Sequence, residues 1–191
     1  ERDAEARRGL ESILPFAKAV LCAAREVPPG GPGNVARYAR GEDYHALVRR
    51  ELKAVVASLR RYAPAGAHFR VCVDTAPVLE LEWAVRAGLG FVGKNGMLIV
   101  PGVGSHVVLG EVLTDLALAP TAAAVDGTWG KCGGCSACID SCPTFAILGP
   151  RVVDARRCLS YLTIEKRSPF TAEEESWLEG RLFGCDDCQD V

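Results

Sequence analysis

Four closely spaced cysteines between residues 132 and 142 constrain this chain more than any other feature. The stretch reads Cys132-Gly-Gly-Cys135-Ser-Ala-Cys138-Ile-Asp-Ser-Cys142-Pro143, a C-x2-C-x2-C-x3-C-P spacing. This spacing is typical of bacterial ferredoxins, in which one tight turn supplies three thiolates to a cubane iron–sulfur cluster. The two glycines carry no Cβ, so the backbone can pass close to the inorganic sulfide. The pattern therefore predicts a [4Fe–4S] site.

The last cysteine of this run, Cys142, indicates a second cluster. In two-cluster ferredoxins the fourth cysteine of such a run ligates the other cluster, so further ligands are expected downstream. The chain supplies three more, and we assign one complete [4Fe–4S] cluster to a four-cysteine set: Cys142, Cys158, Cys185 and Cys188. The other cluster is assigned to a three-cysteine set: Cys132, Cys135 and Cys138. Its fourth ligand is expected beyond Val191, so the four-cysteine set should assemble its cluster more securely in this chain.

Structural zinc is the main alternative to iron–sulfur clusters, because C-x2-C pairs also build zinc sites. Four cysteines within eleven residues, followed by three more, fit two zinc sites poorly. A disulfide framework fits less well still, because no secretory segment is visible and such dense spacing indicates metal binding.

Length and composition set broader limits. The 191 residues are 49% hydrophobic, enough for one or two domains with a real core. The formal net charge of −2 neither indicates nor excludes a polyanionic partner. No apolar run is long enough to span a membrane and no signal peptide is visible, so we expect the reducing cytoplasm and no membrane partner. We expect the protein to be a monomer. The chain opens on Glu1 rather than Met, and we expect it to be truncated at both ends.

Hydrophobic periodicity predicts the elements ahead of the clusters. A buried strand is expected at 19–23 and a half-buried strand at 68–74. Between them, Asp43 caps a helix whose apolar stripe is formed by Val48, Leu52, Val55, Val56 and Leu59. A second helix begins at Pro77 and ends at Gly88, and two strands at 97–100 and 105–115 are joined by a tight turn. We place the domain boundary at the end of a small-residue loop, giving domains 1–128 and 129–191.

Asp74 is the first candidate functional residue outside the cysteines. It ends a predicted strand just before a helix, where catalytic and ligand-binding groups collect in α/β proteins. A simple helix-capping role is the alternative. From Arg37 to Arg70 there are also eight basic residues against three acidic ones. This excess could meet phosphates, although a solvated helix face gives the same pattern.

Two short motifs are set aside. Residues 88–93 spell G-x-G-x-x-G, but a helix precedes them and a strand follows, the reverse of a nucleotide-binding loop. Asp43-Tyr44-His45 begins a D-x-H-x-x-G cobalamin signature, but Val48 stands in place of its glycine. Neither motif carries weight in the prediction.

Several longer motifs together resemble the epoxyqueuosine reductase family. Ahead of the clusters they are VDTAPVLE (73–80), RAGLGFVGKN (86–95) and LGE (109–111). In the cluster region they are the cysteine run with its proline, DARRCLSYLTIE (154–165) and GCDDCQ (184–189). The resemblance covers the chain from about Val35 onward and includes the gaps between the seven cysteines.

This resemblance implies an α+β fold, with a reductive-dehalogenase-like cobalamin-binding α/β domain followed by a ferredoxin-like two-cluster domain. It implies reduction of the epoxide of epoxyqueuosine, at the wobble position of certain tRNAs, to queuosine. Cobalamin would be the reductant and the two [4Fe–4S] clusters its electron relay. An external flavodoxin- or ferredoxin-like electron donor is expected to supply the clusters.

The resemblance also implies roles for individual residues. The general acid falls on Asp74, which would protonate the leaving oxygen and would need apolar surroundings that raise its pKa. The corrin is expected to contact Arg37, Tyr38, Lys94, Asn95, Met97, Ser160 and Tyr161, with the 41–45 turn nearby.

The chain departs from the family pattern at two places, and both leave the substrate open. Phe145 stands where a glycine is usual, and residues 106–108 (His-Val-Val) replace a strand that often carries aromatics. Either change could reshape the substrate pocket. A corrinoid iron–sulfur reductase of another small substrate, resembling reductive dehalogenases, therefore remains open. A ferredoxin-type electron-transfer module without corrin remains open too.

Overall fold

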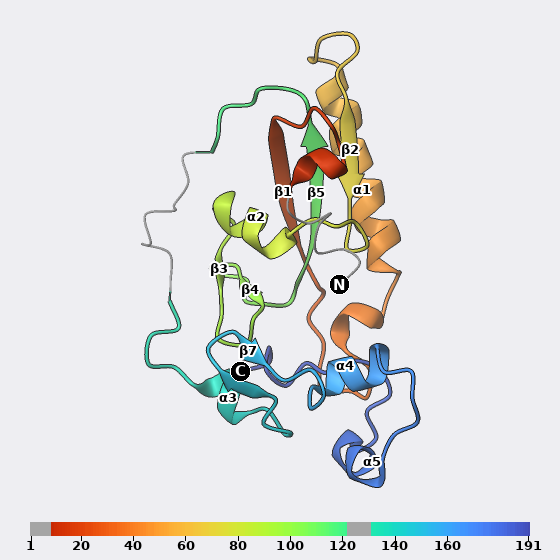
Figure 1. The fold of residues 1–191 in the computed structure, drawn as a ribbon, viewed down its shortest axis with the longest axis vertical. Coiled ribbons are helices and arrows are strands. Elements are labelled where there is room, and N and C mark those ends of the chain that lie inside the picture. The colour runs from red at the N-terminus through yellow and green to blue at the C-terminus, as the bar shows by residue number, and fades with distance from the viewer. Residues whose placement is uncertain (1–8, 122–130) are drawn as a thin grey trace. The chain divides into compact units, whose positions relative to one another are not determined.

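The computed structural model describes residues 9–121 and 131–191, which form two compact units (Figure 1). Unit 1 comprises residues 9–25, 43–90 and 107–121, and unit 2 comprises 26–42, 91–106 and 131–191. Both units contain helices and strands, so the predicted α+β class is confirmed. Within the two described ranges, every helix is too short or too polar to cross a membrane.

Unit 1 is a three-stranded sheet with helices on its two faces. The strands lie in the order β1 (Ala19–Glu26), β5 (Val107–Thr114) and β2 (Phe69–Cys72). Strands β2 and β5 are antiparallel, and Cys72 lies opposite Glu111. Helix α1 (Tyr44–Arg60) runs beside β2 in Figure 1, and α2 (Glu80–Arg86) follows the β2 loop.

Two small cores hold these layers together. On the α1 face, Val48, Leu52 and Val56 pack with Val73 and Val112. On the other face, Cys72, Val78 and Leu113 form a second buried cluster, against which Trp83 of α2 packs. Each fully buried aliphatic side chain contributes roughly 1.5–3 kcal/mol, so the three α1 residues dominate the docking of this helix.

The sequence predicted α1 and most of its buried face. Asp43 is the N-cap, and its side chain accepts a hydrogen bond from the His45 N–H at 2.9 Å. The predicted stripe is correct at Val48, Leu52 and Val56, which recur every four residues. Val55 was wrongly included, because it is 46% exposed at the rim of that stripe.

Unit 2 is built from short elements between cysteine loops. Strands β3 (Phe91–Val92) and β4 (Leu98–Ile99) form one hairpin, and β6 (Ile147–Gly149) and β7 (Val152–Val153) form another. The helices are η3 (Arg37–Ala39), α3 (Ala137–Asp140), α4 (Leu159–Ile164) and α5 (Ala172–Leu178). Helix α5 begins with a capping box between Thr171 and Glu174.

One sequence prediction about connectivity fails. The strands expected at 97–100 and 105–115 exist, but they do not pair: β4 pairs with β3, and β5 joins the sheet of unit 1. The turn between them closes on itself through hydrogen bonds between Val100 and Gly104, so the chain leaves it without forming a longer hairpin.

The two compact units are interleaved along the chain. The sequence predicted a single division after residue 128. That boundary lies outside the described residues. Residues 26–42 join the C-terminal region because Leu182 N donates to Asn34 O and Ala36 N to Phe183 O, both at 2.7 Å. Periodicity along the chain carries no information about such long-range pairing.

Candidate functional site

The loop after β2 holds Asp74 in an unusual conformation. Its φ of 55° lies in the left-handed region, which few non-glycine residues adopt. Glu80 stabilises this conformation, because its carboxylate accepts a hydrogen bond from the Asp74 N–H at 2.8 Å. The Asp74 side chain is 53% exposed, so its carboxyl group is available to a ligand.

His45 bridges Asp74 and Asp43. Its Nε2 lies 3.1 Å from Asp74 Oδ2, and its Nδ1 lies 2.7 Å from Asp43 Oδ1. Burial is the largest influence on the imidazole and lowers its pKa. The hydrogen bonds to Asp43 and Asp74, together with their charges, outweigh it and raise the pKa of His45 above its ordinary value. The hydrogen bond from His45 in turn lowers the pKa of Asp43. Two carboxylates therefore flank one imidazole and favour its protonated form.

His45 is the functional candidate that the sequence prediction missed. The Asp-x-His pair was set aside because its cobalamin signature is incomplete. The pairing of His45 with Asp43 could have been read from the sequence. An aspartate at the N-cap of a helix lies beside the residue two positions later, which is in the first helical turn. In unit 1 the Asp74 carboxyl contacts the His45 imidazole. The apolar surroundings expected for Asp74 stay a prediction.

Glu111 is a buried carboxyl group close to this loop. Its exposure is 0%, and both of its oxygens lack a hydrogen-bond partner among the described residues. Burial, followed by the charge of Glu80, raises the pKa of Glu111 to about 8. Glu111 therefore carries a proton at neutral pH. The sequence marked its LGE motif but predicted no role for it.

A cavity of about 320 Å³ adjoins the Asp74 loop within unit 1. Its lining includes residues 75–77 of the loop, the hydroxyl-bearing Ser12, and two arginines, Arg49 and Arg70. Both arginine side chains are exposed at its edge. The basic excess between residues 37 and 70 thus places two guanidinium groups where an anion next to Asp74 would meet them.

In unit 2 several cysteine thiols lie close enough to raise one another's pKa. Burial, followed by the charges of Cys185, Cys158, Cys142 and Cys138, raises the pKa of Cys188 to about 12. Burial likewise raises the pKa of the Cys138 thiol, followed by the charges of Cys132 and Cys135. The cysteines thus lie within electrostatic reach of one another, and Cys138 of the three-cysteine set reaches Cys188 of the four-cysteine set as well. The division into two sets stays a prediction.

The cysteine loops have features that suit a cluster. The Ala146 N–H donates to Cys142 Sγ at 3.2 Å, the kind of bond that stabilises a ligating thiolate. Gly133 has a φ of 51°, which lets the first loop turn tightly. Among the described residues no three His, Cys, Asp or Glu side chains converge on a single-ion site. A cubane takes one thiolate at each corner, so its ligands stand farther apart than those of one ion.

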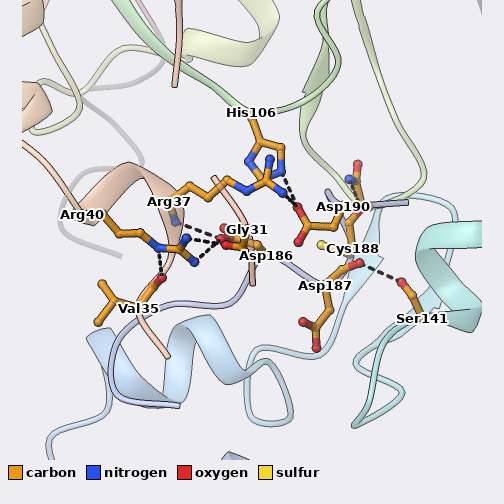
Figure 2. Close-up of polar contacts among 11 residues, drawn as sticks. Gly31, Val35, Arg37, Arg40, His106, Ser141, Asp186, Asp187, Cys188 and Asp190 are labelled. Atoms are coloured by element: carbon orange, nitrogen blue, oxygen red, sulfur yellow. Dashed lines mark hydrogen bonds and ion pairs between the residues drawn. The ribbon is translucent and has the colours of Figure 1, made fainter. Parts of the chain in front are cut away.

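The last cysteine loop is fixed by side chains from distant segments, as Figure 2 shows. Asp186 accepts a hydrogen bond from the Arg37 N–H at 2.8 Å. Asp190 pairs with the Arg37 guanidinium at 2.7 Å and with His106 Nε2 at 2.8 Å. Ser141 Oγ donates to Asp187 O at 3.0 Å. The contacts of Arg37 and His106 bind residues 186–190 to the segments 26–42 and 91–106 of the same unit, and Ser141 binds them to the first cysteine run.

All seven residues predicted to contact a corrin lie in unit 2, but they are not equally available. Three of them are used within the unit, namely Arg37, Lys94 and Asn95. The Tyr38 ring lies near Phe183, with centroids 6.3 Å apart. Met97 and Tyr161 are 37% and 42% exposed, and Ser160 is half-buried. Contact with a corrin stays a prediction for all seven.

Comparisons with known proteins match the N-terminal and the C-terminal regions of the chain. A family model described as epoxyqueuosine reductase QueG, DUF1730, matches residues 7–75, and one described as a 4Fe-4S double cluster binding domain matches residues 131–191. The epoxyqueuosine reductase of Pseudomonas aeruginosa is 47% identical over 158 residues, covering 82% of this chain and 42% of the relative. That of Gloeobacter violaceus is 41% identical over 190 residues, covering 96% and 58%.

Solved structures give the same result. A crystal structure of epoxyqueuosine reductase with an epoxyqueuosine-modified tRNA-Tyr stem loop matches with a TM-score of 0.85 and 31% identity. The match covers 100% of this chain and 52% of that one. The chain thus spans about half the length of the relatives it matches.

Proposed function

Because the chain belongs to the epoxyqueuosine reductase family, we propose that the protein containing it reduces the epoxide of epoxyqueuosine in tRNA to give queuosine. The relatives' names and the tRNA stem loop bound to one of them support this substrate. The Asp43–His45–Asp74 arrangement is the single observation that supports the chemistry.

The reaction requires protons that this arrangement can deliver. Converting an epoxide to an alkene and water consumes two electrons and two protons. Asp74 donates the first proton to the epoxide oxygen as a C–O bond breaks. His45, protonated and hydrogen-bonded to Asp74, restores that proton for the second transfer, which releases water. Asp43 accepts a hydrogen bond from His45 Nδ1 and fixes the ring so that Nε2 faces Asp74.

The electrons require cofactors, and the family implies two kinds. The two cysteine sets would hold [4Fe–4S] clusters, for which the grouped thiols and the bond to Cys142 are suited. Cobalamin would supply two-electron reduction when bound. Of the seven predicted contacts, Met97 and Tyr161 are the exposed ones, and Ser160 beside Tyr161 is half-buried. A reductive-dehalogenase-like arrangement of the cobalamin domain is part of this proposal.

Recognition of tRNA is supported by the cavity beside the Asp74 loop. Phosphate oxygens accept hydrogen bonds from arginine in a fixed geometry, and such contacts position a nucleic acid without reading its sequence. Arg49 and Arg70 are placed to make them next to the proposed acid.

The test is conversion of purified tRNA carrying epoxyqueuosine by the full-length protein with cofactors reconstituted. We expect Asp74→Asn to lose at least about a hundredfold in turnover with clusters and cobalamin retained, since positioned acids contribute about that much. Asp115→Asn is the matched control, because Asp115 forms the same kind of pair with His68, at 2.7 Å, elsewhere in unit 1. Full activity of Asp74→Asn would refute the acid role.

Two further outcomes separate the competing functions. Protein that binds cobalamin but leaves epoxyqueuosine tRNA unchanged would favour a reductase of another small substrate. Protein that assembles clusters but shows no cobalamin spectrum after reconstitution would favour an electron-transfer module.

A further inference from the structure

The β3–β4 hairpin of unit 2 presents Lys94 and Asn95 in a defined turn. Asn95 Oδ1 accepts a hydrogen bond from the Met97 N–H at 3.1 Å, which folds the side chain back over the turn. A Cβ at Gly93 would lie 2.7 Å from that oxygen, so only glycine leaves room for it. Gly96, with a φ of 79°, completes the turn. The two side chains are therefore fixed by the hairpin itself.

Lys94 is directed at the loop of the three-cysteine set. Its Nζ donates to Gly133 O at 2.9 Å and to Cys135 O at 2.7 Å. In the part of the chain that the structure describes, this ammonium group forms no ion pair, so a carboxylate does not neutralise its charge. An uncompensated positive charge thus lies against the backbone that carries cluster ligands.

Asn95 is directed at the other set. Its Nδ2 donates to Cys188 O at 3.0 Å, and its side chain is buried in the cluster unit. Adjacent residues of one turn therefore contact the loops of both cysteine sets, which are separated from the turn by about 40 and about 90 residues of sequence.

We propose that Lys94 raises the reduction potential of the cluster held by the three-cysteine set, and that Lys94 and Asn95 together hold the two cluster loops at a fixed spacing. Reduction adds one negative charge to a cluster, and nearby charge is one of the properties that set its potential. At about 10 Å and an effective dielectric constant of about 20, one unit charge changes a one-electron equilibrium by roughly tenfold. Lys94 is then a positioning and tuning residue of the electron relay rather than a contact of the reacting atoms.

This inference rests on the cluster-binding part of the proposed function and is independent of the substrate. The test uses the full-length protein with its clusters assembled, and it measures iron content and the midpoint potential of each cluster by a redox titration followed by electron paramagnetic resonance. Lys94→Met removes the charge and the donors, and Lys94→Arg keeps both. Lys53→Met, which deletes an exposed charge on α1 of unit 1, is the matched control.

In Lys94→Met we expect one cluster, and not the other, to become harder to reduce by at least about tenfold, or about 59 mV for one electron. Lys94→Arg and Lys53→Met should each stay within about threefold of the unsubstituted protein on the same scale. Unchanged potentials in Lys94→Met, or an equal change in Lys94→Arg, would overturn the proposal.

Loss of iron gives a second readout. If Lys94→Met loses iron from one cluster and Lys94→Arg retains it, the positioning role is supported, whereas equal loss in both variants overturns it. If the unsubstituted protein takes up no iron, the cluster-binding proposal fails and the role of Lys94 fails with it. A failure confined to the Lys94 variants refutes the role of Lys94 alone.

Discussion

Replacing Glu111 with glutamine should remove a large pH dependence of stability. The Glu111 carboxyl is fully buried without a hydrogen-bond partner among the described residues, and its pKa is raised to about 8 from an ordinary 4.5. Its folded-state pKa thus lies above its unfolded-state value. Between the two values the native state keeps a proton that the unfolded state has released, so stability falls as pH rises from about 4.5 to about 8.

The magnitude follows from the two pKa values. When the native state holds one proton more than the unfolded state, a rise of one in pH lowers the free energy of unfolding by about 1.4 kcal/mol. Only the pH range between the two pKa values contributes. From about pH 5 to about pH 7, Glu111 should therefore cost the native state roughly 2–3 kcal/mol. Glutamine has the same shape and does not titrate, so Glu111→Gln should lack this slope and be the more stable protein at neutral pH.

Urea unfolding across this pH range, followed by circular dichroism, measures the difference directly. Glu82→Gln is the matched control, since Glu82 is an exposed carboxylate on α2, the helix that begins with Glu80. Its stability curve should parallel that of the unsubstituted protein. The reasoning is refuted if Glu111→Gln loses stability with pH as steeply as the unsubstituted protein does.

Three further changes test other parts of the structure. Phe145 has a φ of 51° and is 67% exposed, so Phe145→Gly relieves left-handed backbone strain without removing a buried contact. After the entropy cost of glycine is subtracted, urea unfolding should show a gain of about 0.5–1 kcal/mol in stability. A loss of stability would contradict this. Leu52→Ala should cost about 2–5 kcal/mol, measured as a lowered urea midpoint, because it leaves a cavity between α1 and the sheet, whereas exposed Val55→Ala should cost far less. Burial lowers the pKa of His45, but Asp43 and Asp74 outweigh it and raise that pKa above the ordinary 6.5. The contacts therefore contribute their full stabilisation below pH 6.5 and lose it as pH rises through the raised pKa. His45 also loses its proton as pH rises through its raised pKa, so turnover that depends on this proton should fall over the same range. His45→Gln cannot titrate there and should flatten the alkaline side of the pH profile of turnover. An unchanged profile would contradict the role of His45 as a proton donor.

The local elements were predictable because their determinants are adjacent in sequence. The Asp43 cap, the four-residue recurrence of Val48, Leu52 and Val56, and the Thr171–Glu174 capping box each specify a helix without reference to the rest of the chain. The spacing of the cysteines likewise indicated two metal clusters rather than one, and the match to a double-cluster family model agrees with it.

The candidate site was predictable only in part. Asp74 could be singled out by its place between a strand and a helix, and the Asp43–His45 pair by the helix cap, but the contact between His45 and Asp74 could not be predicted. The two are brought together because α1 packs on the sheet beside β2, and 29 residues of sequence separate them. Glu111 is a similar case. The residues next to it in sequence do not reveal that it is buried on the central strand β5, or that its carboxyl has no hydrogen-bond partner among the described residues.

The sequence by itself determined which chemistry the chain carries, because thiol spacing, helix caps and apolar periodicity act over a few residues. Only the tertiary structure decided which segments serve that chemistry. Residues 26–42 and 91–106 join the cluster unit, and Lys94 in the turn of the β3–β4 hairpin contacts a cysteine loop about 40 residues away in sequence. Such contacts depend on the packing of distant surfaces and on which backbone groups are left without a partner, and neither is written in the local pattern of residues.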